Sequence, residues 1–128
     1  ENIFTSVCQA ISALEQPLAL IIQAIPNPEG FKAIAGQYQI SLLFEAFADR
    51  NYQDNGLLIP RGGNSAVITE PKQVLTRCQH LLTTGELLSL NGQPLSLQVD
   101  TLCVHGDNPA ALALVKALQL LIHHPVND

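Results

Sequence analysis

Two short polar motifs each follow an apolar segment of this sequence, and both contain residue types that can do chemistry. The first motif is Glu45-Ala46-Phe47-Ala48-Asp49-Arg50, and the second is His105-Gly106-Asp107. Carboxylates and histidine can move protons in a reaction, and an arginine binds carboxylate or phosphate groups through its planar guanidinium. The sequence therefore contains the parts of an acid–base site with a place for an anion.

Some of these residues also have a structural interpretation. Asp107 and Asn108 are of types favoured at helix N-termini, and we expect Asn108 to cap the helix that follows it. From its position alone, His105 is either a structural or a catalytic histidine. Gly62-Gly63 has no Gly-Lys-Ser/Thr sequence after it, so it does not form the phosphate loop of a nucleotide-binding protein.

The elements that position these motifs follow from the spacing of apolar residues, which alternates between helical repeats and short continuous runs. Continuous runs are typical of parallel strands that are covered on both faces. In chain order, the pattern predicts a helix from Ile3 that ends before Pro17, a strand at 18–22, a helix from Pro28 to about Gln37 capped by Asn27, a strand at 40–46, a helix at 71–82, a hairpin with a two-residue turn at Asn91-Gly92, a strand at 99–104 and a helix from Pro109 to about Ile122.

Residues 47–69 have no sustained period, and a connection of this length is usually a functional loop or a disordered one. We expect it to be ordered, with Arg50 and Arg61 making contacts that hold it. The alternation of helices and buried strands predicts an α/β fold with parallel strands. Ligands of such folds bind at the carboxyl ends of the strands, which is where both polar motifs fall. We therefore expect Glu45, Arg50, His105 and Asp107 to face one cavity.

Composition excludes several classes of protein. The formal net charge is −5 and there is no cluster of basic residues, so the sequence has no electrostatic footprint for nucleic acid. The longest apolar runs are far shorter than the roughly 20 residues that a membrane span needs. The three cysteines are widely spaced, which predicts neither disulfides nor a zinc site, and a cytoplasmic location is expected.

The motifs and their order resemble the C-terminal half of the LamB/YcsF family, from about Leu42 to Leu121. The matching positions are Glu45 to Tyr52, Gly56, Leu58, Pro60-Arg61, Ala66 to Ile68 and Val104 to Ala110. Residues before Ile40 match only in their alternation of helix and strand, and Ser65 stands where the family usually has Gly. The motifs of the family's N-terminal half are absent from this chain.

The resemblance implies a partial (β/α) barrel of the glycoside hydrolase/deacetylase type, with residues 1–128 as a single domain that forms the C-terminal part of the barrel. It also implies a role in the A component of a 5-oxoprolinase, which opens 5-oxoproline to L-glutamate with ATP and with subunits B and C. Within that reaction we expect His105, Asp107 and Glu45 to be catalytic and Arg50, Arg61 and Asp49 to bind substrate. No metal is predicted, and the chain alone is expected to be inactive.

Two alternatives belong to other functional classes. One is a metal-dependent hydrolase of the deacetylase type, although His105 and Asp107 are the only clustered ligand types and catalytic zinc usually takes three protein ligands. The other is a non-catalytic module that binds a small anion. We also expect association with the missing half of the barrel or with copies of the chain, because the last helix is apolar on more than one face.

Overall fold

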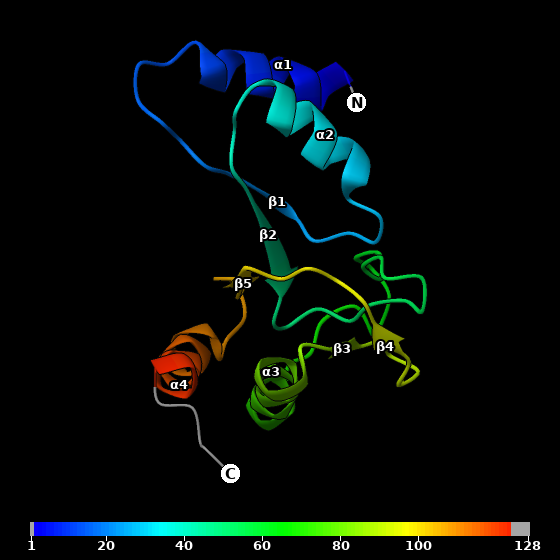
Figure 1. Ribbon diagram of the computed structural model, residues 1–128. Helices are drawn as coiled ribbons and strands as arrows, with labels where there is room; N and C mark the ends of the chain where they lie inside the picture. Colours follow the sequence, from blue (N-terminus) through cyan, green and yellow to red (C-terminus); the bar gives the residue numbers. More distant parts are fainter. Residues whose placement is uncertain (1, 124–128) are drawn as a thin grey trace. The chain divides into compact units, whose positions relative to one another are not determined.

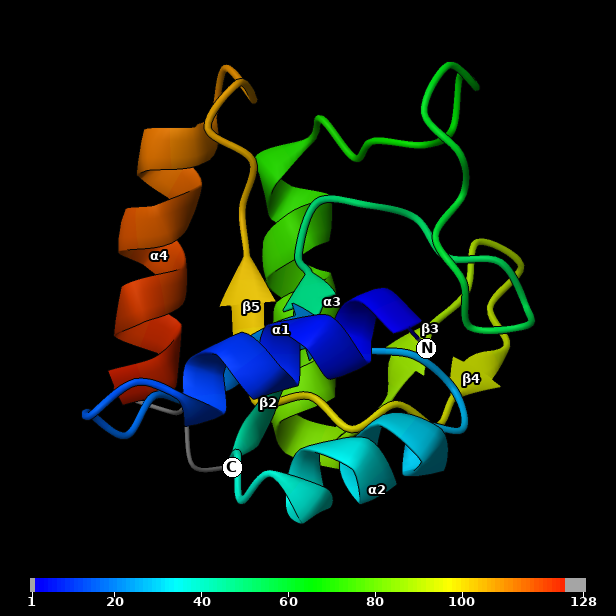
Figure 2. The same ribbon diagram turned by 90° about the horizontal axis from the view of Figure 1, so that it is seen from above.

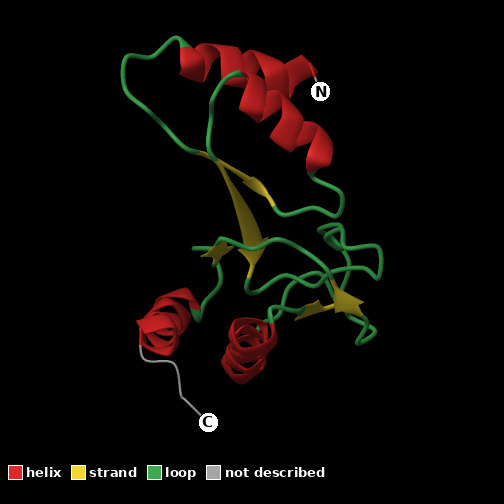
Figure 3. Ribbon diagram, viewed as in Figure 1, coloured by secondary structure: helices red, strands yellow, loops and turns green. Residues whose placement is uncertain are grey.

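Helices and strands alternate along the chain in the computed structural model, which describes residues 2–123 (Figures 1 and 3). The elements are α1 (Asn2–Ser12), β1 (Leu20–Gln23), α2 (Glu29–Gln37), β2 (Leu42–Phe47), α3 (Pro71–Thr84), β3 (Leu87–Leu88), β4 (Pro94–Leu95), β5 (Thr101–Cys103) and α4 (Ala111–His123). The chain divides into two compact units, the first made of residues up to Ala46 with 98–101 and the second of 47–97 with the residues from Leu102 onward.

The first unit is built around the parallel pair β1–β2, in which Leu20 pairs with Leu42 and Gln23 with Glu45. Strand β2 is the middle strand of the order β1-β2-β5, and this confirms the predicted α/β class with parallel strands. Helices α1 and α2 lie side by side (Figures 1 and 2) and pack around Cys8 and Ala35. Within the described residues 2–123 they cover the face of β1 that carries Leu20, and Ile21 on the other face is 51% exposed. The expectation of cover on both faces is therefore wrong for β1 in this part of the chain.

The core of the second unit lies between α3 and α4, which also run side by side (Figure 2). Apolar side chains repeat along α3 at three- and four-residue intervals and meet the buried stripe of α4, as helical periodicity requires. The buried residues of this core are Ala48, Ile68, Val74, Cys78, Leu114 and Leu118. The core therefore joins both helices to the segment that follows β2.

Two local details differ from the sequence prediction. Asn27 has a left-handed backbone with φ 58°, and Pro28 occupies the N-cap position of α2 without a side-chain hydrogen bond, so the predicted Asn27 cap is wrong. The predicted hairpin forms between β3 and β4, but its turn is longer than two residues. The Ser89 N–H donates to the Gln93 carbonyl, and only Gly92 is left-handed, with φ 82°. A two-residue turn with Asn91 and Gly92 at its centre needs positive φ at both residues.

Arg50 holds the long connection 47–69 as predicted, although its partners are carbonyl oxygens and not carboxylates. The predicted contact of Arg61 is not found, because within residues 2–123 its side chain forms no hydrogen bond or ion pair. The Arg50 guanidinium donates from Nη2 to the Ile59 carbonyl at 2.7 Å and from Nε to the Ala66 carbonyl at 3.2 Å. The Tyr52 hydroxyl accepts the Phe47 backbone N–H at 3.1 Å. Arg50 and Tyr52 are both buried, so these contacts lie inside the second unit and hold the loop from within.

The last helix is only partly buried in the described chain. Leu114 and Leu118 are buried, whereas Leu112 is 71% and Leu120 65% exposed. Association through α4 stays a prediction, which sedimentation equilibrium would test. No helix between residues 2 and 123 is long and apolar enough to cross a membrane. The cysteines, all within these residues, form no disulfide there.

We predict that Leu114→Ala destabilises the protein by about 2–5 kcal/mol, because it leaves a cavity in the core between α3 and α4. The matched control is Leu112→Ala on the exposed side of the same helix, which should change the free energy of unfolding by less than about 0.5 kcal/mol. Urea denaturation measures both values. Equal effects of the two substitutions would show that α4 is packed differently.

Candidate active site

Asp49 lies two residues beyond β2 and is completely buried. Its Oδ1 is 2.8 Å from His105 Nδ1, and its Oδ2 accepts the His105 backbone N–H and the Asn108 Nδ2, both at 3.2 Å. A carboxylate without partners would be costly in such a place. These hydrogen bonds stabilise the charged form, and they fix the position of the segment that follows β5.

The pKa of the Asp49 carboxyl reflects these contacts. Burial alone would raise it, but the hydrogen bonds from the side chains of His105 and Asn108 and from the His105 backbone lower the pKa below its ordinary value of 3.8. Asp49 is therefore an anion near neutral pH and can only accept hydrogen bonds. We accordingly assign the proton of a neutral His105 ring to Nδ1, which leaves Nε2 as a hydrogen-bond acceptor.

The His105 ring is held on a second side by an aromatic contact. The rings of Phe47 and His105 are stacked, with centroids 5.3 Å apart and an interplanar angle of 12°. The His105 side chain keeps 20% of its surface exposed. The Asp49 carboxylate holds one nitrogen of the imidazole, and the Phe47 ring packs against the imidazole face. Together they orient the imidazole so that its other nitrogen can act as a general base.

Asn108 supports this arrangement from the start of α4. Its Oδ1 accepts the Ala110 backbone N–H at 3.0 Å, in the turn that leads into α4 at Ala111. The side chain therefore supports the start of the helix from outside it, whereas the sequence analysis predicted a cap. Asn108 Nδ2 donates to Asp49, which the sequence analysis did not predict. The two hydrogen bonds leave the buried amide satisfied at both ends, and they couple the beginning of α4 to the buried carboxylate.

A cavity of about 350 Å³ opens beside this pair. Among the residues that line it are Asp49, Arg61, His105 and Asp107, so the structure brings together four of the six predicted site residues. Arg61 and Asp107 are exposed, and the glycines after Arg61 form part of the wall. The size is within the range of small-molecule sites, and one cation and two carboxylates converge on it.

The other two predicted residues do not line this cavity. Arg50 is buried, and its guanidinium donates to the two carbonyls of the 47–69 loop, so it holds backbone in place. Glu45 belongs to the first unit, where it pairs with Gln23 across β1 and β2. Direct roles of Arg50 in substrate binding and of Glu45 in catalysis stay predictions.

Neither Phe47 nor Arg77 was selected from the sequence. Phe47 looks like an ordinary end of an apolar strand, and only the fold brings it against His105. Arg77 Nη1 donates to the backbone carbonyls of Ala48 and Arg50, which flank Asp49. Its spacing from Val74 and Leu81, at the side of the apolar face of α3, is the signal in the sequence that could have identified it as a half-buried cation.

A metal centre needs several ligating side chains in one place. Between residues 2 and 123, no three His, Cys, Asp or Glu side chains gather closely enough to hold a metal ion. The described residues therefore do not supply the three protein ligands that a catalytic zinc usually takes.

Comparison with known proteins identifies relatives over nearly the whole chain. The model of the LamB/YcsF family matches residues 1–125. The chain is 41% identical over 122 residues to a Vibrio vulnificus protein named as the A component of 5-oxoprolinase, and 36% identical over 116 residues to one of the same name from Limosilactobacillus fermentum. These matches begin well before Leu42, where the resemblance of the motifs starts.

A crystal structure of a lactam utilization protein from Thermus thermophilus has the same fold, with a TM-score of 0.76 and 25% sequence identity over 94% of this chain. The chain covers 46% of that protein, 49% of the Vibrio vulnificus relative and 45% of the Limosilactobacillus fermentum one. It therefore spans about half the length of the relatives that it matches.

We predict that acid destabilises the protein partly through Asp49. Because the folded-state pKa is below that of the unfolded chain, the stability from this group is present above pH of about 4 and is lost as the pH falls through the folded-state pKa. Urea denaturation between pH 7 and pH 2.5 should give a smaller loss of stability for Asp49→Asn than for the unsubstituted protein. Identical pH dependence of the two proteins would contradict the hydrogen-bonded, charged state of Asp49.

Proposed function

The chain belongs to the LamB/YcsF family, and we propose that it forms part of the A component of a 5-oxoprolinase, which opens 5-oxoproline hydrolytically to L-glutamate with ATP. The observation that carries the proposal is the pair of buried Asp49 and oriented His105 at the edge of a cavity. Hydrolysis of an amide needs such a base, and a non-catalytic anion-binding module does not.

The chemistry of the substrate explains the requirement for ATP. A lactam carbonyl is a poor electrophile, and transfer of a phosphoryl group from ATP to its oxygen makes the carbonyl carbon open to attack by water. The bond from this carbon to the ring nitrogen then breaks, the nitrogen takes up a proton, and the carbon is left as an acyl phosphate. A second water hydrolyses the acyl phosphate to the side-chain carboxylate of glutamate and inorganic phosphate, with ADP as the other product. Two kinds of protein group assist these steps: a base for the water, and a donor or cation for the charge that develops on oxygen.

His105 Nε2 is the base in this proposal. It takes a proton from the attacking water, and the Asp49 carboxylate 2.8 Å from Nδ1 stabilises the imidazolium that results. The same imidazolium can then give its proton to the ring nitrogen as the bond to carbon breaks. The stacked Phe47 ring and the His105 backbone hydrogen bond to Asp49 prevent the imidazole from turning away.

Arg61 binds the carboxylate of the substrate in this proposal. It is an exposed cation that lines the cavity, and its planar guanidinium matches a carboxylate with two parallel hydrogen bonds. Asp107, on the same cavity, is the second carboxylate that can accept a proton or orient water. Arg50 serves the site indirectly by holding the loop, and a contribution of Glu45 is retained as part of the proposal.

The complete enzyme has further parts in this proposal. The relatives are named as one component of an enzyme and are about twice as long as this chain. We therefore propose that the remaining half of the fold and subunits B and C complete the site for 5-oxoproline and ATP, that the complex works in the cytoplasm, where ATP is available, and that the 128-residue chain alone is inactive.

We predict that His105→Gln lowers kcat for ATP-dependent formation of glutamate from 5-oxoproline by about 10²–10⁴-fold, because the general base is lost. The assay uses the full-length protein with subunits B and C. The control is His123→Gln at the exposed end of α4, which should keep full activity. Full activity of the His105 variant would refute the proposed base, and the absence of any oxoprolinase activity in the unsubstituted complex would favour an anion-binding module.

We predict a different kinetic effect for Arg61→Met. Loss of the cation that binds the substrate carboxylate should raise KM for 5-oxoproline by about 10–100-fold with a much smaller change in kcat, because the interaction is present before and during the reaction. Lys116→Met, which removes an exposed cation from α4, is the matched control. An unchanged KM in the Arg61 variant would assign substrate binding to another group.

A further inference from the structure

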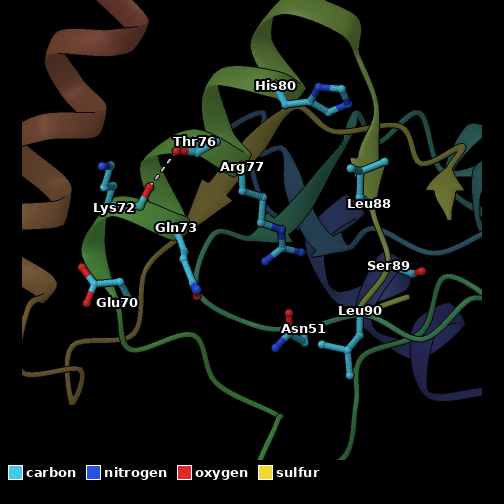
Figure 4. A pocket seen from close by; sticks show the side chains of 10 residues that line it. All are labelled: Asn51, Glu70, Lys72, Gln73, Thr76, Arg77, His80, Leu88, Ser89 and Leu90. Carbon is cyan, nitrogen blue, oxygen red and sulfur yellow. Dashed lines mark hydrogen bonds between the residues drawn. The ribbon is translucent and has the colours of Figure 1, made fainter. Parts of the chain in front are cut away.

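A second cavity in the same unit lies between α3 and the segment of β3 and its turn (Figure 4). Its volume is about 720 Å³, and it shares no lining residue with the cavity beside His105. The residues that line it are Asn51, Glu70, Lys72, Gln73, Thr76, Arg77, His80, Leu88, Ser89 and Leu90. This volume is ample for a small molecule.

Arg77 is the central polar group of this cavity. Its side chain reaches from α3 toward the middle of the lining residues, with Leu88 and Leu90 on the opposite side (Figure 4). Nη1 donates to two backbone carbonyls, and the guanidinium carbon lies 5.4 Å from the centroid of the Tyr52 ring. Nη2 is buried and has no hydrogen-bond partner within the described chain.

The charge of the Asp49 carboxylate attracts the Arg77 guanidinium from a distance but forms no ion pair with it. Between residues 2 and 123, no Asp or Glu oxygen forms an ion pair with its guanidinium, and burial lowers its pKa from the ordinary value. A partly desolvated cation with an unpaired N–H group costs free energy. A bound anion that accepts a hydrogen bond from this N–H group removes that cost. The cavity is where such an anion can reach the guanidinium.

Neighbouring groups add a ring nitrogen, a cation and one carboxylate, because the exposed Glu70 also lines the cavity. His80, three residues along α3, has a buried Nε2 that is also without a partner in the described residues, and Lys72 adds an exposed cation at the edge. Leu88 and Leu90 are 37% and 50% exposed and offer an apolar wall opposite these groups. The cavity thus has hydrogen-bond donors on one side and leucines on the other. This arrangement suits an oxyanion that carries a short apolar part.

We propose that this cavity is a second binding site, which takes a small carboxylate or phosphate compound with Arg77 as its anchor. The site is physically linked to Asp49, because the carbonyls that Arg77 holds belong to Ala48 and Arg50 on either side of it. A bound anion therefore stabilises the guanidinium that supports the segment of the candidate active site.

The test measures binding directly and does not depend on the proposed reaction. The probes are inorganic phosphate and butyrate, titrated at constant ionic strength into full-length protein labelled with ¹⁵N, and the observed signal is Arg77 Nε–Hε. We expect saturable shifts of this signal with at least one probe. Tighter binding of butyrate assigns the site to carboxylates with an apolar part, and tighter binding of phosphate assigns it to phosphate compounds.

Two variants locate the binding. Leu90→Glu places a carboxylate at the wall of the cavity while Arg77 and its backbone contacts stay intact, and it should weaken the affinity for either probe by about tenfold or more. Arg61→Met alters only the other cavity and should leave the affinity unchanged. No saturable shift in the unsubstituted protein, unchanged affinity in the Leu90 variant, or an equal loss in the Arg61 variant would each overturn the proposal.

Discussion

The buried carboxylate of Asp49 is the constraint on which the second unit of this protein depends. An anion without exposure to water persists only where several donors surround it, and here the donors all come from the connection between β5 and α4. Asp49 thus ties the end of one strand to the end of the next and to the beginning of α4. One group thereby sets both the local fold and the orientation of His105.

Two arginines, the buried Arg50 and the half-buried Arg77, hold the chain around Asp49 by a different means. Arg50 and Arg77 donate to backbone carbonyls and not to carboxylates. Arg50 joins parts of the 47–69 connection to one another, and Arg77 joins α3 to the start of that connection. The Ala66 carbonyl accepts the Asn51 backbone N–H as well as Arg50 Nε, so the cation adds to a backbone hydrogen bond of the loop. Burial also separates the functions of the arginines, because Arg61 is exposed and its charge is available to an anion in the cavity.

Much of the fold follows from the sequence because the periodicity of apolar residues is strong. Helix α3 begins at Pro71 and ends before Gly85, whose φ of 75° suits a left-handed helix end, and both residues are standard signals of helix termini. Local signals fail where tertiary contacts decide the conformation. Asn27 looks like a cap but takes a left-handed backbone, and Ile21 looks buried but has no helix over its face in the described chain.

The site is predictable to the extent that strand ends define it, since Asp49 and His105 both follow strands that neighbour one another. The sequence does not show what each arginine does, because the residue type is the same and only the burial and the hydrogen-bond partners of the side chains differ. The helical pattern of α3 contains part of the distinction, because Arg77 lies three residues after Val74 and four before Leu81, at the side of the apolar face. A cation at such a position must find acceptors inside the protein, and the carbonyls on either side of Asp49 are those acceptors. The sequence pattern and the geometry therefore lead to the same conclusion. The contacts that hold Asp49 and its neighbours in place reach from the cavity beside His105 to the cavity beside α3.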